Sequence, residues 1–90
     1  MFEWDPDKSE ATRRRSGFGF DIIEDFDWDY AACLEEQEIH GETREKWIGP
    51  IEDMLYVAVL TQRGDRLRVI SMRRATQTEI IIWRKEFQDG

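Results

Sequence analysis

The stretch of sequence that decides the fold is DMLYVAVLTQRGDRLRVISMRR, residues 53–74. Its first nine residues, 53–61, form an almost continuous apolar run, which is typical of a central strand buried on both faces. The Arg-Gly-Asp at 63–65 is a turn signal, and residues 66–73 return to a strand-forming composition. The stretch therefore predicts a β-hairpin at the centre of a sheet.

Signals at the N-terminal end predict a short strand and two helices. Residues 2–5 are typical of a strand. Asp5 followed by proline predicts the start of a helix over 6–15, which Gly17 would end. A second helix is expected from Asp21, which can serve as the N-cap of an amphipathic stretch.

Signals on either side of the hairpin predict further strands and a final helix. Residues 30–42 indicate an extended segment or edge strand that ends in a glycine turn, and residues 43–49 predict a strand closed by the Gly-Pro pair at its end. After the hairpin, Thr76 can cap a helix over 77–87, and Glu79 stands where a capping box needs its acidic partner.

Together these elements predict a single α+β domain over residues 1–90, with a mostly antiparallel sheet of three to four strands, two N-terminal helices and one C-terminal helix. A chain of 90 residues is long enough for one modest core and too short for two. Trp28 lies among acidic residues and is expected at the surface. We expect the following side chains to be buried: Trp4, Trp47, Trp83 and Cys33.

No part of the sequence indicates export or membrane insertion. The N-terminal residues lack the basic, apolar and cleavage regions of a signal peptide, and the longest apolar runs are far shorter than the roughly 20 residues of a membrane span. The single cysteine, Cys33, cannot form an internal disulfide. We therefore expect a cytoplasmic protein that does not contact a membrane.

Charge is strongly polarised along the chain, whose formal net charge is −7. Residues 21–53 hold twelve acidic and two basic residues, a formal charge of −10. Residues 61–90 hold seven basic and four acidic residues, a formal charge of +3. A basic region on an acidic protein can bind a polyanion locally, while the overall charge disfavours indiscriminate nucleic-acid binding and suits a basic protein partner.

The predicted last strand, residues 66–73, concentrates arginine. Strict alternation puts Arg73 on the face opposite to Arg66, Arg68 and Arg74. Arginine stays charged at any relevant pH, and its planar fork donates two hydrogen bonds to a phosphate. The alternative interpretation is that these arginines pair across the sheet with carboxylates of the acidic middle segment.

Three motifs give the chain a resemblance to a known family. FEWDPDK at 2–8, RGDRLRVISMRRAT at 63–76 and a glutamate three residues later resemble, in the same order, the BrnT family of bacterial type II toxins. GETREKWIG at 41–49 takes the place of the family's strand with a Gly-Glu-Glu-Arg-like motif. The resemblance covers nearly the whole chain. It implies a RelE-like fold and an endoribonuclease that inhibits translation.

The resemblance also implies partners. It predicts a ribbon-helix-helix antitoxin of the BrnA type that neutralises the toxin, and RNA as the substrate. The toxin would contact operator DNA only through the antitoxin. Both a homodimer and a 2:2 toxin–antitoxin complex are compatible with this resemblance.

The predicted first and last helices depart from the family pattern. Relatives carry an Asn-x-x-Lys-His-Gly-like stretch in the first, whereas Thr12, Arg15 and Ser16 stand at the Asn, Lys and His positions here. In the last, Trp83 replaces a tyrosine, and residues 80–82 are Ile where the family is mostly basic. These departures imply weaker RNA binding. They favour an alternative function, a catalytically weak or inactive member that acts as a protein-interaction module.

Cleavage of RNA without a metal ion requires a base for the ribose 2′-hydroxyl, cations at the phosphate and an acid for the leaving oxygen. We expect Arg73 and Arg44, supported by Arg68, to form a phosphate-binding cluster. Histidine titrates near neutral pH, which makes His40 the candidate for proton transfer, and Glu42 is the alternative base. Further RNA contacts are expected from Arg63, Arg66 and Arg74.

A calcium-binding loop is a third interpretation of one stretch. DFDWDY at 25–30, together with Glu36, places acidic residues at the spacing of such a loop. However, Tyr30 stands where the sharp turn needs glycine. We therefore expect neither a metal ion nor another cofactor.

Overall fold

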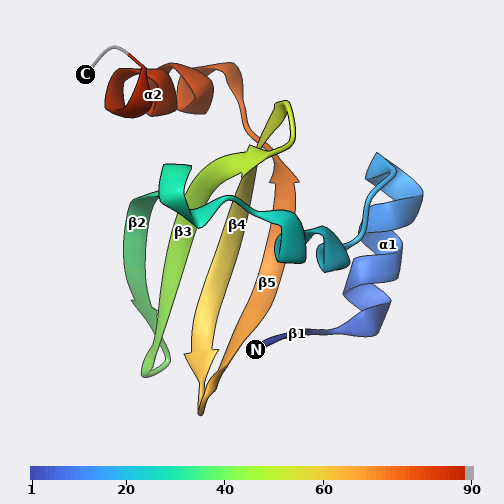
Figure 1. The fold of residues 1–90 in the computed structure, drawn as a ribbon. Helices are drawn as coiled ribbons and strands as arrows, with labels where there is room; N and C mark the ends of the chain where they lie inside the picture. The colour runs from blue at the N-terminus through green and yellow to red at the C-terminus, as the bar shows by residue number, and fades with distance from the viewer. Residues whose placement is uncertain (89–90) are drawn as a thin grey trace.

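The computed structural model describes residues 1–88 and is built around a five-stranded mixed sheet (Figure 1). The strand order is β1-β5-β4-β3-β2, in which β1 runs parallel to β5 and all other neighbours are antiparallel. The predicted α+β class with a mostly antiparallel sheet is confirmed. In chain order the elements are β1 (Phe2–Trp4), α1 (Pro6–Ser16), the 3₁₀-helices η1 (Phe20–Asp25) and η2 (Trp28–Tyr30), β2 (Ala32–Ile39), β3 (Glu42–Ile51), β4 (Met54–Arg63), β5 (Arg66–Arg74) and α2 (Gln77–Phe87).

The prediction of three to four strands is wrong, because the sheet has five. Two segments account for the difference. The short N-terminal strand pairs in parallel with β5, and the extended segment predicted over 30–42 contains a full strand, β2. The sequence indicated extended structure in both segments. Whether they join the sheet depends on hydrogen bonding between segments far apart in the sequence, which local signals do not report.

The hairpin of β4 and β5 forms the centre of the sheet, as predicted. β4 has a neighbouring strand on each side. Its residues Val57, Ala58 and Leu60 are at most 2% exposed. Gly64 in the connecting turn has φ 61°, a left-handed conformation that favours glycine.

Both α-helices begin and end near the predicted residues. Asp5 caps α1 by accepting a hydrogen bond from the backbone N–H of Asp7 at 2.9 Å, and Gly17 ends the helix with φ 87°. Thr76 caps α2, and the capping box with Glu79 is present. Local capping signals were therefore sufficient to place these two helices.

The predicted second N-terminal helix is a 3₁₀-helix, and its predicted N-cap is wrong. Asp21 lies inside η1 and pairs with an arginine of α1 instead of capping the helix. Phe20, Ile23 and Phe26 are at most 5% exposed. A 3₁₀-helix has three residues per turn, so this three-residue spacing brings all three side chains to the core side.

The Gly49-Pro50 pair does not close β3, contrary to the prediction, because the strand continues to Ile51. The carbonyl of Pro50 accepts a hydrogen bond from the backbone N–H of Asp27 at 3.0 Å. The side of this proline that lacks an N–H therefore faces away from β4 and interrupts no bond between the two strands. A Cβ at Gly49 would meet the ring of Phe26 at 2.7 Å, so glycine permits the close packing of this phenylalanine.

The core lies on one face of the sheet, beneath the segment that contains η1 and η2 (Figure 1). We call this face the covered face and the opposite one the open face. Trp4 and Trp47 pack against the core, as predicted. The buried side chains of the core are Phe18, Phe20, Ile23, Phe26, Ile51, Tyr56, Ala58, Leu60, Val69 and Met72.

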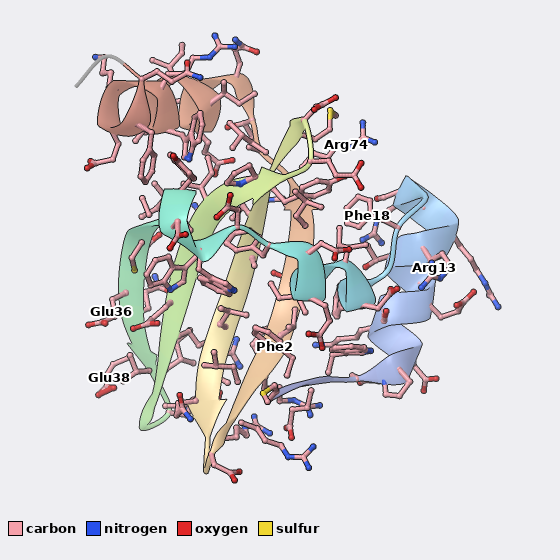
Figure 2. The ribbon with its side chains drawn as sticks, viewed as in Figure 1. Phe2, Arg13, Phe18, Glu36, Glu38 and Arg74 are labelled. Carbon is pink, nitrogen blue, oxygen red and sulfur yellow. The ribbon has the colours of Figure 1, made fainter. Side chains whose placement is uncertain are left out.

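Two predicted core residues lie elsewhere. Trp83 is outside the core and is half-buried in α2, where its indole N–H donates to the carbonyl of Tyr30 at 2.7 Å. Cys33 is exposed because it lies on β2, the edge strand. Glu36 and Glu38 extend from the same outer strand (Figure 2). Trp28 is 38% exposed, in agreement with its predicted surface position.

Candidate nucleic-acid interface

The open face consists of rows of residues that are directly opposite one another on neighbouring strands. Partners in such a row project to the same side of a sheet. One row contains Arg44, Thr61 and Arg68, and the partner of Arg68 on β1 is Glu3. The next two rows are Lys46 with Val59 and Ser71, and Ile48 with Val57 and Arg73. Basic side chains from β3 and β5 therefore share this face.

A β-bulge in β5 determines which arginines reach the open face. Val59 pairs with Ser71 and Leu60 pairs with Val69, so Ile70 is the extra residue. The extra residue reverses the alternation of faces from that point onward. The expectation that Arg73 lies opposite to Arg66 and Arg68 is therefore wrong: all three share the open face, and Arg74, the partner of Tyr56, points to the other side.

One group of charged side chains lies near the hairpin turns and is called the hairpin-end cluster: Glu42, Arg44 and Arg63. Glu42 lies on the first residue of β3, with its Oε1 at 3.3 Å from an Nη of Arg63 and its Oε2 at 3.7 Å from Nε of Arg44. The atoms Glu42 Oε2 and Arg44 Nε are buried and have no hydrogen-bond partner within residues 1–88. The two atoms lie 3.7 Å apart, beyond hydrogen-bonding distance, so this ion pair is looser than the one between Glu42 and Arg63.

The charge state of Glu42 follows from its surroundings. Partial burial opposes ionisation, but the charge and hydrogen bond of Arg63, the nearby hydroxyl of Thr61 and the charge of Arg44 outweigh it. The pKa of Glu42 therefore lies below its ordinary value. At neutral pH this side chain is a carboxylate held between two guanidinium groups.

A hollow of about 130 Å³ lies on the open face beside the hairpin-end cluster. Gln37 and Ile39 of β2 and Arg44 and Lys46 of β3 line it together with Val59 and Glu35. Arg44 and Lys46 are two residues apart on one strand, so both side chains project from the same face. The hollow therefore combines two cations with an apolar floor.

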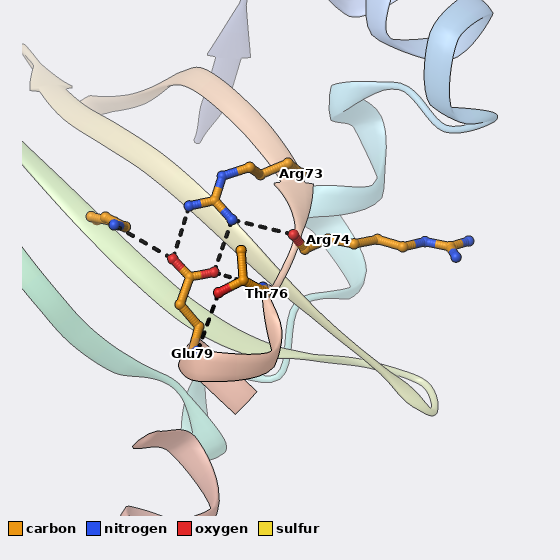
Figure 3. Close-up of polar contacts among 5 residues, drawn as sticks. Arg73, Arg74, Thr76 and Glu79 are labelled. Carbon is orange, nitrogen blue, oxygen red and sulfur yellow. Dashed lines mark hydrogen bonds and ion pairs between the residues drawn. The ribbon is translucent and has the colours of Figure 1, made fainter. Parts of the chain in front are cut away.

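A second group, the helix-end cluster, lies at the opposite end of the open face and comprises Lys46, Arg73 and Glu79. The two Nη atoms of Arg73 each donate to one carboxylate oxygen of Glu79 at 2.8 Å, and Nζ of Lys46 lies at 3.5 Å (Figure 3). The backbone N–H of Thr76 donates to the same carboxylate at 2.8 Å. Arg73 also donates to the carbonyl of Arg74 at 3.3 Å, so three of its five N–H groups are bonded within the protein.

These contacts shift the titration of both partners. The hydrogen bonds from Arg73 are the main cause that lowers the pKa of Glu79 to about 2, with further contributions from Thr76 that together exceed the opposing effect of burial. The same hydrogen bonds raise the pKa of Arg73. Glu79 is 8% exposed and stays ionised in its bonds to the sheet and to the first turn of α2.

The predicted site residues therefore separate into two places. His40 lies in the turn between β2 and β3, exposed and with φ 51°, next to the hairpin-end cluster. Arg73 is level with Ile48, six residues along β3 from Glu42, which corresponds to about 20 Å. The structure therefore does not bring His40 and Arg73 together, although both were predicted in one catalytic site.

The ion pairs support the alternative interpretation of the arginines only in part. Arg63 and Arg44 pair with Glu42, which belongs to the acidic middle segment. Arg68 pairs with Glu3 at 3.1 Å, and Arg73 pairs with Glu79, so these two acidic partners lie outside that segment. Within residues 1–88, neither Arg66 nor Arg74 forms an ion pair.

Sequence reasoning missed two contributors to this face. Lys46 could have been found, because it alternates with Arg44 on a predicted strand. Glu79 was recognised only as a capping residue, and its pairing with Arg73 depends on how α2 folds back onto the sheet. The capping box sets the start of the helix but carries no signal for this second partner.

The aspartates of the calcium-loop spacing do not form a ligand cluster. Asp27 uses its carboxylate to cap η2 by accepting from the backbone N–H of Asp29 at 3.2 Å. In the described part of the chain, no three His, Cys, Asp or Glu side chains are grouped so that they could hold a metal ion. The helices in residues 1–88 are all too short or too polar to span a membrane.

Comparison with known families connects the chain to a function. A family model described as "Ribonuclease toxin, BrnT, of type II toxin-antitoxin system" matches residues 4–79. The chain belongs to the BrnT family. The match includes every residue of both clusters and ends at Glu79. BrnT proteins are ribonuclease toxins, so RNA is the substrate of the family and an antitoxin is its partner. No curated protein matches the chain.

Proposed function

We propose that this BrnT protein is an endoribonuclease that cleaves RNA without a metal ion and thereby inhibits translation, with its open face as the RNA-binding surface. The proposal includes a RelE-like arrangement of the sheet and a cytoplasmic site of action. The observation that carries it is the hairpin-end cluster, where Glu42 lies between two guanidinium groups beside a hollow. This arrangement supplies a proton acceptor and cations for phosphate at one place.

The cations of the open face suit the phosphate. Arg44 and Arg63 share a single carboxylate, so the hairpin-end cluster keeps a positive charge and free N–H donors. Arg68 lies in the same row as Arg44, two strand spacings or about 10 Å away. These arginines would stabilise the charge that develops on the phosphate oxygens during cleavage. Arg66, unpaired within residues 1–88, would extend the surface toward the hairpin turn.

The proton transfers are assigned to the same end of the sheet. Glu42 is ionised and would accept the proton of the ribose 2′-hydroxyl as its oxygen attacks the phosphorus. The bond from phosphorus to the 5′-oxygen then breaks, which gives a 2′,3′-cyclic phosphate and a 5′-hydroxyl end. His40, in the adjacent turn, is the candidate that protonates this leaving oxygen. Because the pKa of Glu42 is lowered, we expect a weak base and a modest rate.

Arg73 has a structural role in this proposal. Both of its Nη atoms are bonded to Glu79, so a phosphate at this guanidinium would have to compete with that carboxylate. Arg74 points to the covered-face side, and any RNA contact it makes would lie away from the open face. The phosphate-binding role is therefore assigned to Arg44, Arg63 and Arg68 first.

The proposed partner is a BrnA-like ribbon-helix-helix antitoxin. It would neutralise the toxin, and the toxin would reach operator DNA only through it. A homodimer or a 2:2 complex would be compatible with this role. The exposed acids of β2, among them Glu36 and Glu38, would suit a basic segment of such a partner.

The proposal is tested by induced expression in a bacterial host. Wild type, Arg44→Gln and Arg14→Gln are compared by growth and by incorporation of labelled amino acid. Arg14 has an 80% exposed side chain on α1 and provides the same change of charge away from the sheet. We expect arrest by wild type and Arg14→Gln, and growth with Arg44→Gln at equal levels of folded protein. Arrest by all three would refute the assignment of the site, and growth with all three would refute the ribonuclease proposal.

One observation favours a second function, that of a non-catalytic binding protein. The position of the family's histidine is held by Ser16, and the only histidine, His40, is an exposed residue in a turn. In that case the acidic strand β2 would bind a basic partner and no RNA would be cleaved. Incubation of purified protein with labelled RNA in EDTA separates the two functions, because only the first predicts new 5′-hydroxyl ends.

A further inference from the structure

A second hollow, of about 270 Å³, lies at the edge of the sheet between α1 and β5. It belongs neither to the hairpin-end cluster nor to the helix-end cluster. Lys8, Thr12 and Arg15 line it from α1, at the i, i+4 and i+7 positions of one helix face. From the other side it is lined by Ile70 and Ser71 of β5, with Phe20 nearby.

The two cations of this hollow have no carboxylate partner. Within residues 1–88, neither Lys8 nor Arg15 forms an ion pair, and the one hydrogen bond of Arg15 is a long one, 3.5 Å, to the hydroxyl of Thr12. The acids nearby are already engaged: Glu10 pairs with Arg13 and Arg14, and Asp21 pairs with Arg13. The hollow is therefore positive and still has N–H donors to offer.

The backbone of β5 is irregular at the same place. β1 pairs with β5 only as far as Val69, so no strand covers the outer edge of β5 beyond that residue. The bulge adds Ile70 directly after it. Unpaired backbone groups at this edge can bond a ligand, and bulges of this kind often lie next to active sites.

One row of the open face runs from this hollow to the hollow beside the hairpin-end cluster. Ser71 lies in the same row as Val59 and Lys46, which line the hollow beside the hairpin-end cluster. Two strand spacings, about 10 Å, separate β3 from β5. An RNA strand that lies across the sheet along this row would pass from one hollow into the other.

We propose that the hollow between α1 and β5 is a second RNA subsite, in which Lys8 and Arg15 bind a phosphate and Ile70 supports a ribose or base. The proposal rests on the proposed function, because it extends the RNA path from the open face. Cations paired with hydroxyls and an apolar floor match a nucleotide, which presents a phosphate and a flat apolar ring together. The subsite would hold the strand so that a phosphate a few nucleotides along lies at the hairpin-end cluster.

The test measures binding of a fluorescein-labelled single-stranded RNA of about 12 nucleotides, a length within the usual range for such surfaces. All of its riboses are 2′-O-methylated so that it cannot be cleaved. Lys8→Gln and Arg15→Gln are compared with Arg14→Gln, which makes the same charge change on the far side of α1. We expect Kd to rise about five- to tenfold for each of the first two and less than about twofold for the control.

Two further measurements decide the result: the salt dependence of Kd, and the Kd of the open-face variant Arg44→Gln. Each loss of one phosphate contact should lower the slope of log Kd against log salt by about 0.7 for a single strand. If Lys8→Gln and Arg15→Gln behave like Arg14→Gln while Arg44→Gln weakens binding, the subsite is refuted and the proposed function stands. If wild type binds no RNA, both proposals fail.

Discussion

The two charged clusters of the open face contain the same kinds of residues and use them differently. In the helix-end cluster, Glu79 takes both Nη atoms of Arg73 at 2.8 Å. In the hairpin-end cluster, Glu42 is shared by Arg44 and Arg63 at 3.7 and 3.3 Å. Two buried atoms of this cluster, Oε2 of Glu42 and Nε of Arg44, lack a hydrogen-bond partner within residues 1–88. The comparison teaches that the tightness of internal pairing, rather than the number of arginines, indicates where a phosphate can bind.

The helix-end cluster has a task in the fold. α2 exposes Ile81 and Ile82, each close to half of its surface, so only part of the helix is buried against the protein. The carboxylate of Glu79 bonds the helix start to Arg73 on β5 and lies near Lys46 on β3. These polar contacts fix α2 on the sheet.

The largest expected effect is a loss of RNA cleavage when the hairpin-end cluster is changed. Glu42→Gln keeps the shape of the side chain but removes the proton acceptor, so we expect RNA cleavage to fall by about 10²- to 10⁴-fold. Stability should change little, because the site is partly solvated. Cleavage of a labelled RNA and thermal unfolding are measured together. Glu36→Gln, an exposed acid on the neighbouring strand β2, is the matched control. Equal loss of activity in both variants would show that overall charge, not the cluster, matters.

The next effect is on stability at the helix-end cluster. Glu79→Gln should reduce the free energy of unfolding by about 2 kcal/mol, because it breaks a largely buried ion pair whose arginine is partly solvated. Urea denaturation at neutral pH measures the difference from wild type. RNA cleavage under conditions where the variant is folded should stay within about threefold of wild type. If Glu79→Gln is as stable as wild type, the helix-end cluster does not have the structural role that we give it.

The stability that Glu79 contributes should fall as the pH is lowered. The pKa of Glu79 is lowered from its ordinary value near 4.5 to about 2 in the folded protein. A depressed carboxylate pKa contributes stability above the unfolded pKa and loses it as pH falls toward the folded one. The contribution of roughly 2 kcal/mol should therefore disappear between about pH 5 and pH 2. Wild type and Glu79→Gln should converge in stability over this range, and parallel curves would contradict the assignment.

A smaller effect tests the geometry of the fork. Arg73→Lys preserves the charge but not the paired hydrogen bonds, so stability should fall by about 1 kcal/mol. Arg63→Lys, at the hairpin-end cluster, replaces a single contact and should cost less than about 0.5 kcal/mol. Urea denaturation of the two variants, measured side by side, compares their free energies of unfolding. A larger loss for Arg63→Lys would reverse the roles that we give to the two clusters.

The smallest effect is expected from the edge of the open face. Arg66 forms no ion pair within residues 1–88, so Arg66→Gln should leave stability unchanged. RNA binding should weaken about two- to threefold, as expected for one peripheral phosphate contact. Fluorescence anisotropy of the labelled, 2′-O-methylated RNA measures the Kd of this variant. A loss as large as that of Arg44→Gln would mean that the RNA lies closer to the hairpin turn than we propose.

Much of the fold could be predicted because its signals are local. The apolar run of β4 and the caps Asp5 and Thr76 lie within a few residues of the elements they specify. The bulge at Ile70 could not be predicted, since it arises from how β5 meets β4. It changed the site, because it brings Arg73 to the same face as Arg66 and Arg68.

The pairing of the arginines was also beyond the sequence. Glu3 and Arg68 are 65 residues apart and meet only because β1 joins the sheet beside β5. Composition shows where positive charge gathers along the chain, but an arginine with a distant carboxylate partner looks the same as one without. Only the fold distinguishes Arg73, whose two Nη atoms both bond to Glu79, from Arg44, whose Nε has no hydrogen-bond partner among the described residues.

The most direct test of the central claim is RNA cleavage in EDTA by purified wild type, Arg44→Gln and Arg73→Lys, with the melting temperature of each recorded on the same samples. We expect Arg44→Gln to lose cleavage and keep its melting temperature, and Arg73→Lys to keep cleavage and melt lower. The opposite result, with cleavage lost in folded Arg73→Lys and retained in Arg44→Gln, would place the phosphate at the helix-end cluster and contradict the account.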